Sequence, residues 1–282
     1  MTDNHSAAQG EPGPEETDDT AGTAIDTTVA HSARVWNYWL GGKDNYKVDR
    51  VVAEELAETF PGIRDIARQV RLFLFRAIQY LVVEAGVRQF LDIGTGLPTA
   101  NNTHEIAQGT DPQARIVYVD NDPLVLVHAR ALLTSSPEGV TDYVQADVRD
   151  PDRILREAAR TLDFAQPIGL MMLGILGWIP DSDNPRAIVS RLLDPLPSGS
   201  YLVIDDSTNT DPVCVEAVRT FNQNPRLAGS YHLRSPEQIA RFFDGLELVE
   251  PGVVSTSQWR PESSRWAEAV EVSDYAGVGR KP

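Results

Sequence analysis

Apolar residues along positions 66–81 recur with the spacing of one helical face. They stand 4, 7, 8, 11, 12 and 15 positions after the first, and Gly86 follows where such a helix would stop. The members of this face are Ile66, Val70, Phe73, Leu74, Ala77, Ile78 and Leu81. The pattern predicts an amphipathic helix that precedes the first strand.

Beyond this helix, apolar runs alternate with helical segments. We expect strands at 88–93, 115–120, 141–145, 167–173, 199–204, 246–250 and 274–280. Two of these runs, 116–119 and 168–173, are continuously apolar, which is typical of parallel strands covered on both faces. The last two expected strands have no helical pattern between them, so we expect an antiparallel pair at one edge of the sheet.

Five of the intervening helices share one start signal, a capping side chain followed by proline. The pairs are Asp122-Pro123, Asp150-Pro151, Asn184-Pro185, Asp211-Pro212 and Ser235-Pro236. This alternation predicts an α/β fold, with one doubly wound, Rossmann-like sheet and an N-terminal helical extension of about 55 residues.

Charge divides the chain into two parts. The net charge is -16, and residues 1–30 carry seven acids without a Lys or Arg, which leaves 34 acids against 25 bases in the remainder. We expect an acidic disordered tail at 1–31 and one domain at 32–282, with the helical extension at 32–86 and the core at 87–282. The acidic balance disfavours nucleic acid as a partner.

The single cysteine, Cys214, cannot form an internal disulfide, and no apolar window is long enough for a membrane span. A cytoplasmic protein without a membrane partner is therefore expected. The five histidines are scattered without metal-ligand spacing, so no metal site is predicted. We expect His104 on a helix surface.

A glycine turn follows the first expected strand. Gly94-Thr95-Gly96 ends an apolar run, and Asp120 ends the next run 24 residues after Gly96. This pairing suits the ribose of NAD and of S-adenosylmethionine alike. Thr99 replaces the third glycine of a dinucleotide motif, and Pro98 delays the helix to about residue 101. A cofactor without a diphosphate, S-adenosylmethionine, is favoured.

Three acids stand at or just after the first three strands. Asp92 suits the cationic amino-acid end of the cofactor, directly or by fixing the glycine loop, and is otherwise a strand-end cap. Asp120 is the candidate ribose ligand. Asp147 is a candidate partner of the adenine amino group, with the N–H of Val148 beside it, and is otherwise an ordinary loop acid.

These residues resemble the class I S-adenosylmethionine-dependent methyltransferases. More narrowly, the chain is similar to an actinobacterial S-adenosyl methyltransferase family formerly described as a domain of unknown function. The similarity covers about residues 32–282 and is carried by the segments 33–46 (ARVWNYWLGGKDNY), 90–99 (FLDIGTGLPT), 117–123 (VYVDNDP), 145–147 (QAD), 239–246 (IARFFDGL) and 277–282 (GVGRKP).

The resemblance implies a seven-stranded sheet whose last strand is antiparallel, with the cofactor at the carboxyl ends of the first four strands. It places the methionine end of the cofactor on Gly94, Thr95 and Gly96, the ribose on Asp120, and the adenine beside Asn121, Asp147 and Val148. The chain departs from the family at two places where a histidine is frequent, because it has Gly177 after the fourth strand and Asp206 after the fifth.

The aromatic block at 36–46 contains a double glycine. Helical extensions of this superfamily commonly lie over the cofactor, so we expect a lid with Asn37, Lys43 or Asn45 near the amino-acid end. The alternative is a helical cap that buries Trp36 and Trp39 and leaves Lys43 in solvent.

Methyl transfer needs a base only when the nucleophile arrives protonated. Asp205 and Asp206 are the acids best placed for this role, and Asp206 is the candidate. Because neighbouring strand residues point in opposite directions, we expect at most one of them to face the site and the other to be a cap or surface acid. The alternative is that both are ordinary loop carboxylates. Trp178 is expected in the wall of the cleft.

The sequence therefore predicts a methyltransferase that uses S-adenosylmethionine. The acceptor is left unidentified, with a small molecule preferred over a protein, and neither the target atom nor the oligomeric state is assigned. A protein that binds the cofactor without turnover is the alternative, and an NAD-dependent oxidoreductase ranks third because Pro98 and Thr99 interrupt its motif.

Overall fold

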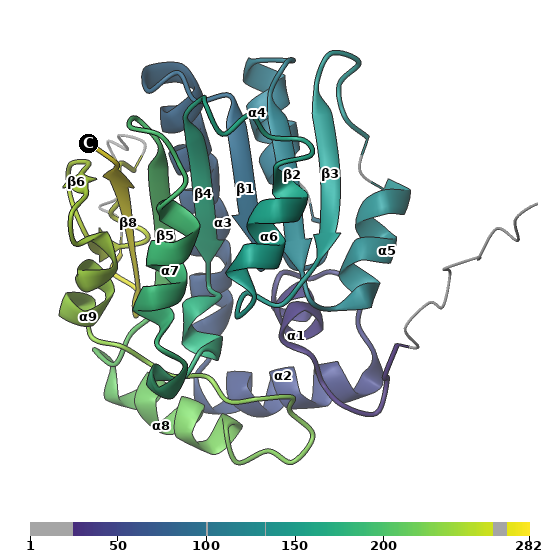
Figure 1. Cartoon of the computed structure of the whole chain (residues 1–282). Coiled ribbons are helices and arrows are strands. Elements are labelled where there is room, and N and C mark those ends of the chain that lie inside the picture. Colours follow the sequence, from purple (N-terminus) through teal and green to yellow (C-terminus); the bar gives the residue numbers. More distant parts are fainter. Residues whose placement is uncertain (1–24, 100, 133, 262–269) are drawn as a thin grey trace, which may run out of the picture.

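The computed structural model describes residues 25–99, 101–132, 134–261 and 270–282 (Figure 1). Most of the predicted acidic tail, residues 1–24, lies outside this range. The last residues of the predicted tail are packed, since Ala30 is fully buried and its N–H donates to the Arg226 carbonyl at 2.7 Å. The packed part of the chain thus begins before Ser32, where we expected the domain to start.

A single mixed sheet organises the fold. Its strands within the described residues are β1 (Gln89–Ile93), β2 (Arg115–Asp120), β3 (Val140–Gln145), β4 (Ile168–Leu173), β5 (Tyr201–Ser207), β6 (Glu247–Leu248), β7 (Val254–Ser255) and β8 (Asp274–Arg280). Seven follow the order β3-β2-β1-β4-β5-β8-β6, and β7 pairs with β8 off this path. The strands β1 to β5 are parallel, and β8 is antiparallel to β5 and β6. The predicted doubly wound sheet with an antiparallel last strand is confirmed.

The α-helices are α1 (Ser32–Trp39), α2 (Lys47–Thr59), α3 (Ile63–Gln79), α4 (Thr103–Thr110), α5 (Pro123–Leu132), α6 (Pro151–Ala158), α7 (Pro185–Leu193), α8 (Pro212–Phe221) and α9 (Pro236–Ala240). The five helices predicted from a capping residue and proline all begin at that proline. In α6, for example, the Asp150 carboxylate accepts the N–H of Arg153 at 3.1 Å. Local capping chemistry therefore sets these starts.

Helices cover both faces of the sheet (Figure 1). On one face, α6, α7 and α9 pack against strand residues such as Leu91 and Ile93. On the other face, α3 and α4 pack against Phe90 and its neighbours. Phe90 belongs to one cluster and Leu91 and Ile93 to the other, so apolar side chains of β1 are buried on both faces of the sheet.

A third group of helices lies across the carboxyl ends of the parallel strands. The helices α1 and α2, the start of α3 and α8 enclose an apolar cluster that includes Val35, Leu56, Ile66 and Phe221 (Figure 1). The predicted N-terminal helical extension is therefore confirmed, and it covers the edge of the sheet where the strand-end acids stand.

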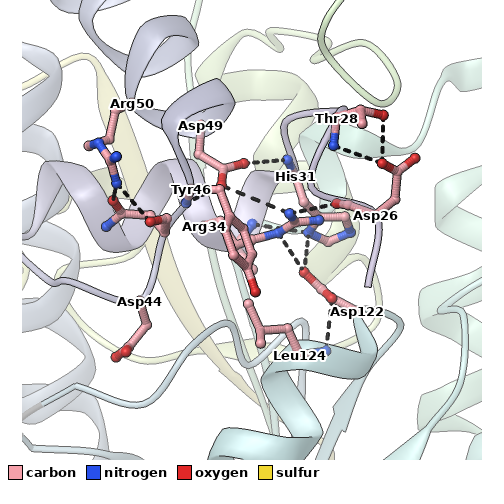
Figure 2. A network of polar contacts seen from close by, with 12 residues as sticks. Asp26, Thr28, His31, Arg34, Asp44, Tyr46, Asp49, Arg50, Asp122 and Leu124 are labelled. Carbon is pink, nitrogen blue, oxygen red and sulfur yellow. Dashed lines mark hydrogen bonds and ion pairs between the residues drawn. The ribbon is translucent and has the colours of Figure 1, made fainter. Parts of the chain in front are cut away.

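Arg34 of α1 fastens this extension to the sheet (Figure 2). Its Nε lies 3.2 Å from Oδ2 of Asp122 at the start of α5, and its Nη1 lies 3.9 Å from Oδ2 of Asp49 in α2. All three side chains are buried. His31 adds to the network, since its N–H donates to Asp49 at 3.0 Å and its Nδ1 lies 3.2 Å from Asp122. One guanidinium thus offsets two buried carboxylates.

We expect Arg34→Met to lower the free energy of unfolding by about 3–5 kcal/mol, because it leaves the Asp49 and Asp122 carboxylates without their cation. Urea unfolding followed by circular dichroism measures this loss. The matched control is Arg64→Met, whose ion pair with Glu54 is about two-fifths exposed and should be worth less than about 1 kcal/mol. Equal losses in the two variants would contradict the assignment of Arg34.

Within the described residues, no helix combines the length and the apolar character needed to cross a bilayer.

Candidate functional site

A cavity of about 290 Å³ lies between the carboxyl ends of the strands and the helices α1, α3 and α8. Its wall has two distinct parts. The glycine-loop end comprises residues 92–97, 119–121 and 146–149, from β1, β2 and the segment after β3. The aromatic end is formed by Trp178, Ser207, Cys214, Val218, Phe221, Tyr231 and Asp274. Trp36, Asn37 and Trp39 of α1 line the cavity as well.

The glycine loop depends on its two glycines. Gly94 and Gly96 have φ angles of +74° and +67°, which residues with a Cβ rarely adopt. A Cβ at Gly94 would also lie 2.9 Å from the Ile175 side chain. The Gly94 N–H donates to the Val119 carbonyl at 2.9 Å, and the Thr95 hydroxyl donates to the Asp92 carbonyl at 3.0 Å. The loop is thus held at the edge of the sheet with its backbone bare toward the cavity.

Asp120 joins the end of β2 to this loop. Its Oδ2 accepts the Gly96 N–H at 2.9 Å, and its Oδ1 accepts the Asp122 N–H at 2.9 Å. Burial raises the pKa of Asp120, while those two N–H groups and the nearby His31 lower it. The side chain lines the cavity and retains lone pairs that can accept hydroxyl groups.

Asp92 occupies the cavity wall at the end of β1. It accepts the Thr103 hydroxyl at 2.6 Å, and it is buried. Burial raises the pKa of Asp92 to about 6, although the Thr103 hydrogen bond and the Arg71 guanidinium lower it. The Thr103 contact ties the strand end to the first residue of α4, and Thr103 follows the predicted helix start near residue 101 by two positions.

Asn121, Asp147 and Val148 line the cavity beside β2 and β3. The Asp147 carboxylate accepts the N–H of Arg149 at 2.8 Å and lies 3.3 Å from its guanidinium. Arg149 also contacts Asp183 at 2.8 Å, and it lines the cavity. No motif in the sequence marks Arg149, and its second acidic partner, Asp183, lies on a later loop.

Lys43 is placed differently from the other predicted cofactor residues. It is exposed, and within the described residues the cavity wall does not include it. Asn37 does line the cavity and is buried, where its Oδ1 accepts the Asp44 N–H at 3.1 Å and the Asn45 side-chain amide at 2.9 Å. A Cβ at Gly42 would collide with Asn37, which explains the second glycine of the double glycine.

Two expectations about polar residues are wrong. His104 is 2% exposed rather than on a helix surface, because its ring contacts the Tyr118 hydroxyl at 2.9 Å. Asp205 and Asp206 are both buried, so neither is a surface acid. The strand β5 continues to Ser207 and pairs with β8 along its whole length, which encloses both side chains.

Asp206, the candidate base, does not line the cavity itself within the described residues. The Tyr231 hydroxyl donates to its Oδ1, and Tyr231 is the residue that faces the cavity. Burial raises the pKa of Asp206 to about 7, although Tyr231 and the Arg234 guanidinium, 3.8 Å away, lower it. No sequence motif marks Tyr231, which stands 25 positions after Asp206.

A third buried acid, Asp274 of β8, completes this group. Burial and the Asp206 charge raise the pKa of Asp274 to about 8, and burial raises that of Asp205 well above its usual range. The neighbouring Cys214 thiol has a pKa raised to about 12 by burial, so it is not a thiolate nucleophile. Within the described residues, no three His, Cys, Asp or Glu side chains are grouped to hold a metal ion.

The fold and this cavity define a nucleoside-cofactor site of the class I methyltransferase type. The wall combines a glycine loop, a carboxylate fixed at the end of β2 and a second acid after β3, at the carboxyl edge of a parallel sheet. The helix α4 begins only at Thr103, whereas in a dinucleotide-binding motif the helix starts within the glycine motif itself.

The comparisons with known proteins give the family. A family model described as S-adenosyl methyltransferase matches residues 18–282, and the chain belongs to this family. The cofactor is accordingly S-adenosylmethionine. Among proteins with curated descriptions, none matches the chain.

Solved structures agree with this assignment. A DUF574 family protein from Streptomyces avermitilis MA-4680 is 42% identical, with a TM-score of 0.85 over 92% of this chain and 100% of the other. A protein from Thermobifida fusca YX is 40% identical, with a TM-score of 0.83, and the match covers 91% of this chain and 96% of the other. The plantazolicin methyltransferase BamL shares the fold at 13% identity, with a TM-score of 0.53 over 88% and 95%.

The buried acids make stability depend on pH. The pKa of Asp274 rises from about 4 in the unfolded chain to about 8 in the fold, so its protonated form is favoured by folding. This contribution is complete below about pH 4 and is lost as the pH rises to about 8. We expect the unfolding free energy of Asp274→Asn to fall less than that of the wild type between about pH 5 and pH 8.5.

Urea titrations across this pH range measure the difference. The control is Asp152→Asn, an exposed carboxylate paired with Arg191 at 2.6 Å, which should follow the wild type. A variant at Asp274 that retains the full wild-type slope would show that this acid is ionised in the fold.

Proposed function

We propose that the cavity holds S-adenosylmethionine at its glycine-loop end and that the protein methylates a small molecule bound at the aromatic end. The observation that carries this proposal is the Asp120 carboxylate, fixed by two backbone N–H groups between the glycine loop and the cavity. The chemistry that the cofactor supplies when bound is a transferable methyl group on a sulfonium.

The donor set fits this cofactor. Asp120 accepts the ribose hydroxyls, and Gly94, Thr95 and Gly96 let the amino-acid end approach the backbone. Asp92, with its pKa near 6, becomes the carboxylate partner of a cationic amine, since such a charge favours ionisation. Asn121, Asp147 and Val148 border the adenine, and Arg149 closes that side through its contact with Asp147.

The shape of the aromatic end supports a small acceptor. Trp178 packs with ring centroids 5.2 Å from Tyr231 and 6.3 Å from Phe221, and Trp36 and Trp39 of α1 bound the same cavity. A compartment between α1 and α8 excludes water and orients one molecule beside the cofactor. The chain's lone cysteine supports the further proposal of a cytoplasmic location.

The helix α1 fits the role of a lid within the proposed 32–86 extension. It lines the cavity through Trp36, Asn37 and Trp39, and it is fastened to the start of α5 through Arg34 and His31. A cofactor inside the cavity would therefore lie against this helix.

We expect Asp120→Ala to weaken binding of S-adenosylhomocysteine at least about tenfold, because it removes a charged hydrogen-bond acceptor. Isothermal titration measures the affinity, and NADH should not bind the wild type. The control is Asp163→Ala, which also removes an acceptor of a backbone N–H, that of Ala165 at 2.9 Å, but lies at the amino end of the sheet. Near-normal affinity in a folded Asp120→Ala would place the ribose elsewhere.

Cofactor binding should also slow amide hydrogen exchange in α1. Closure of the cavity over a ligand lowers local opening, so we expect protection of Ser32–Trp39 on addition of S-adenosylhomocysteine. Mass spectrometry of peptic fragments resolves this segment, and α7 (Pro185–Leu193) on the outer face serves as the reference. Protection of both helices alike would indicate global stabilisation instead of a lid.

A further inference from the structure

The aromatic end of the cavity terminates in a wall of hydrogen-bond acceptors. Tyr231, Ser207 and Asp274 face the cavity, and the Asp206 carboxyl stands directly behind Tyr231. The proposed cofactor site does not include this wall. The hydrogen-bond acceptors in the wall indicate which chemical group a methyl acceptor must present.

Tyr231 is held so that its oxygen can only accept. Its hydroxyl donates to Asp206, and its oxygen accepts the Ser207 N–H at 3.2 Å, so the hydroxyl proton is already used within the protein. The ring sits where Gly177 has no side chain, since a Cβ at Gly177 would collide with the ring and lie 2.8 Å from Oδ1 of Asp206. Gly177, the Tyr231 phenol and the Asp206 carboxyl thus pack directly against one another.

Asp274 is a second acceptor in the same wall. It is 1% exposed, and its Oδ2 accepts the Ser207 hydroxyl at 3.1 Å. Its Oδ1 accepts no hydrogen bond of regular geometry from the described residues, although the Thr256 hydroxyl is near enough to lower the pKa of this acid. It faces the carboxyl of Asp205, and two buried carboxyls can stand together only when a proton lies between them. A cationic donor from the cavity can take the place of that proton.

Charge at this wall is unbalanced. Three buried carboxyls, those of Asp205, Asp206 and Asp274, stand close together, and only that of Asp206 has a guanidinium beside it. That guanidinium, Arg234, lies 3.8 Å from Asp206 and donates to the carbonyls of Leu176 and Ile179 at 2.7 Å each. The remaining titratable groups facing the wall are Tyr231 from the segment before α9, Cys214 of α8 and Asp211 at the N-cap of α8. A positive ligand group is the missing counterpart.

The side walls suit the body of such a ligand. Trp178 and Phe221 offer aromatic faces, and Val218 adds apolar surface. Aromatic faces attract cations as well as apolar rings. The compartment therefore combines a ring-binding wall with an end wall rich in carboxyl and phenol oxygens, which can accept hydrogen bonds from a ligand.

We propose that the methyl acceptor is an amine carried on an apolar or aromatic body, with its ammonium group bound by Tyr231 and Asp274. This inference rests on the proposed function. The ammonium gives one proton to the Asp274 carboxylate, and the electron pair of the broken N–H bond stays on nitrogen as the nucleophile. Asp206 acts through Tyr231 as a positioning residue.

Binding of 2-phenylethylamine and of 2-phenylethanol, its uncharged counterpart, tests the proposal. In titrations near pH 8 with S-adenosylhomocysteine present, we expect the wild type to bind the amine at least about tenfold more tightly than the alcohol. Asp274→Asn and Tyr231→Phe should each reduce this preference to about threefold or less while alcohol affinity stays within about twofold. The control is Tyr275→Phe, which removes a similar tyrosine–acid pair, with Glu271, outside the cavity.

Proton release on amine binding is a measurement that would not change if Tyr231 and Asp274 had only a structural role. Because the pKa values of Asp206 and Asp274 stand at about 7 and about 8, amine affinity should rise from about pH 6 to pH 8.5, and alcohol affinity should not. Titrations in buffers of different ionisation enthalpy should show about one proton released per amine bound, and none for Asp274→Asn.

The outcomes separate the two proposals. Failure of S-adenosylhomocysteine to bind would overturn the proposed function. Cofactor binding together with equal or tighter binding of the alcohol, or with no amine binding at all, would overturn the amine proposal alone. Asp274→Asn keeps the shape of the side chain and is neutral, like the protonated acid that the fold favours, so its fold should persist. Tyr231→Phe repeats the test with a second residue.

Discussion

The structure depends on how buried carboxylates at the strand ends are satisfied. Asp120 takes the N–H groups of Gly96 and Asp122, and the Asp122 side chain in turn takes Arg34 of α1 (Figure 2). This chain of contacts runs from the glycine loop through the start of α5 to the N-terminal extension. A carboxylate left unpaired at any point would cost several kcal/mol. The position of α1 over the cavity is therefore tied to the geometry of the cofactor loop.

Local chemistry explains why so much of the fold follows from the sequence. A capping side chain before proline decides a helix start within two residues, and all five such starts are found where expected. An apolar run flanked by turns decides a buried parallel strand. The glycine loop and Asp120 were predicted as partners because each has a short sequence signal, and the Gly96–Asp120 hydrogen bond joins them. The cofactor itself, S-adenosylmethionine, is given by the family.

The aromatic end could not be predicted because it is assembled from distant segments. Tyr231, Asp206 and Asp274 come from three parts of the chain, and no spacing relates them. Asp205 and Asp206 looked like a strand-end pair, yet pairing of β5 with β8 carries the strand past them and buries both. His104 was misplaced for a related reason, since its buried partner, Tyr118, lies on the next strand.

The two ends of the cavity differ in what they leave for a ligand. At the glycine-loop end, Asp120 is held by backbone N–H groups in one geometry, which favours a ligand of fixed shape such as a nucleoside. At the aromatic end, burial and the closeness of the two acids raise the pKa values of Asp205 and Asp274, so a proton is favoured there where another donor is lacking. A cationic ligand group that replaces this proton gives the buried carboxyls a hydrogen-bond donor that the free protein does not supply. The affinity for a ligand there therefore depends on its charge more than on its shape. This difference suits a protein in which one ligand is constant and the other is chosen by its chemistry.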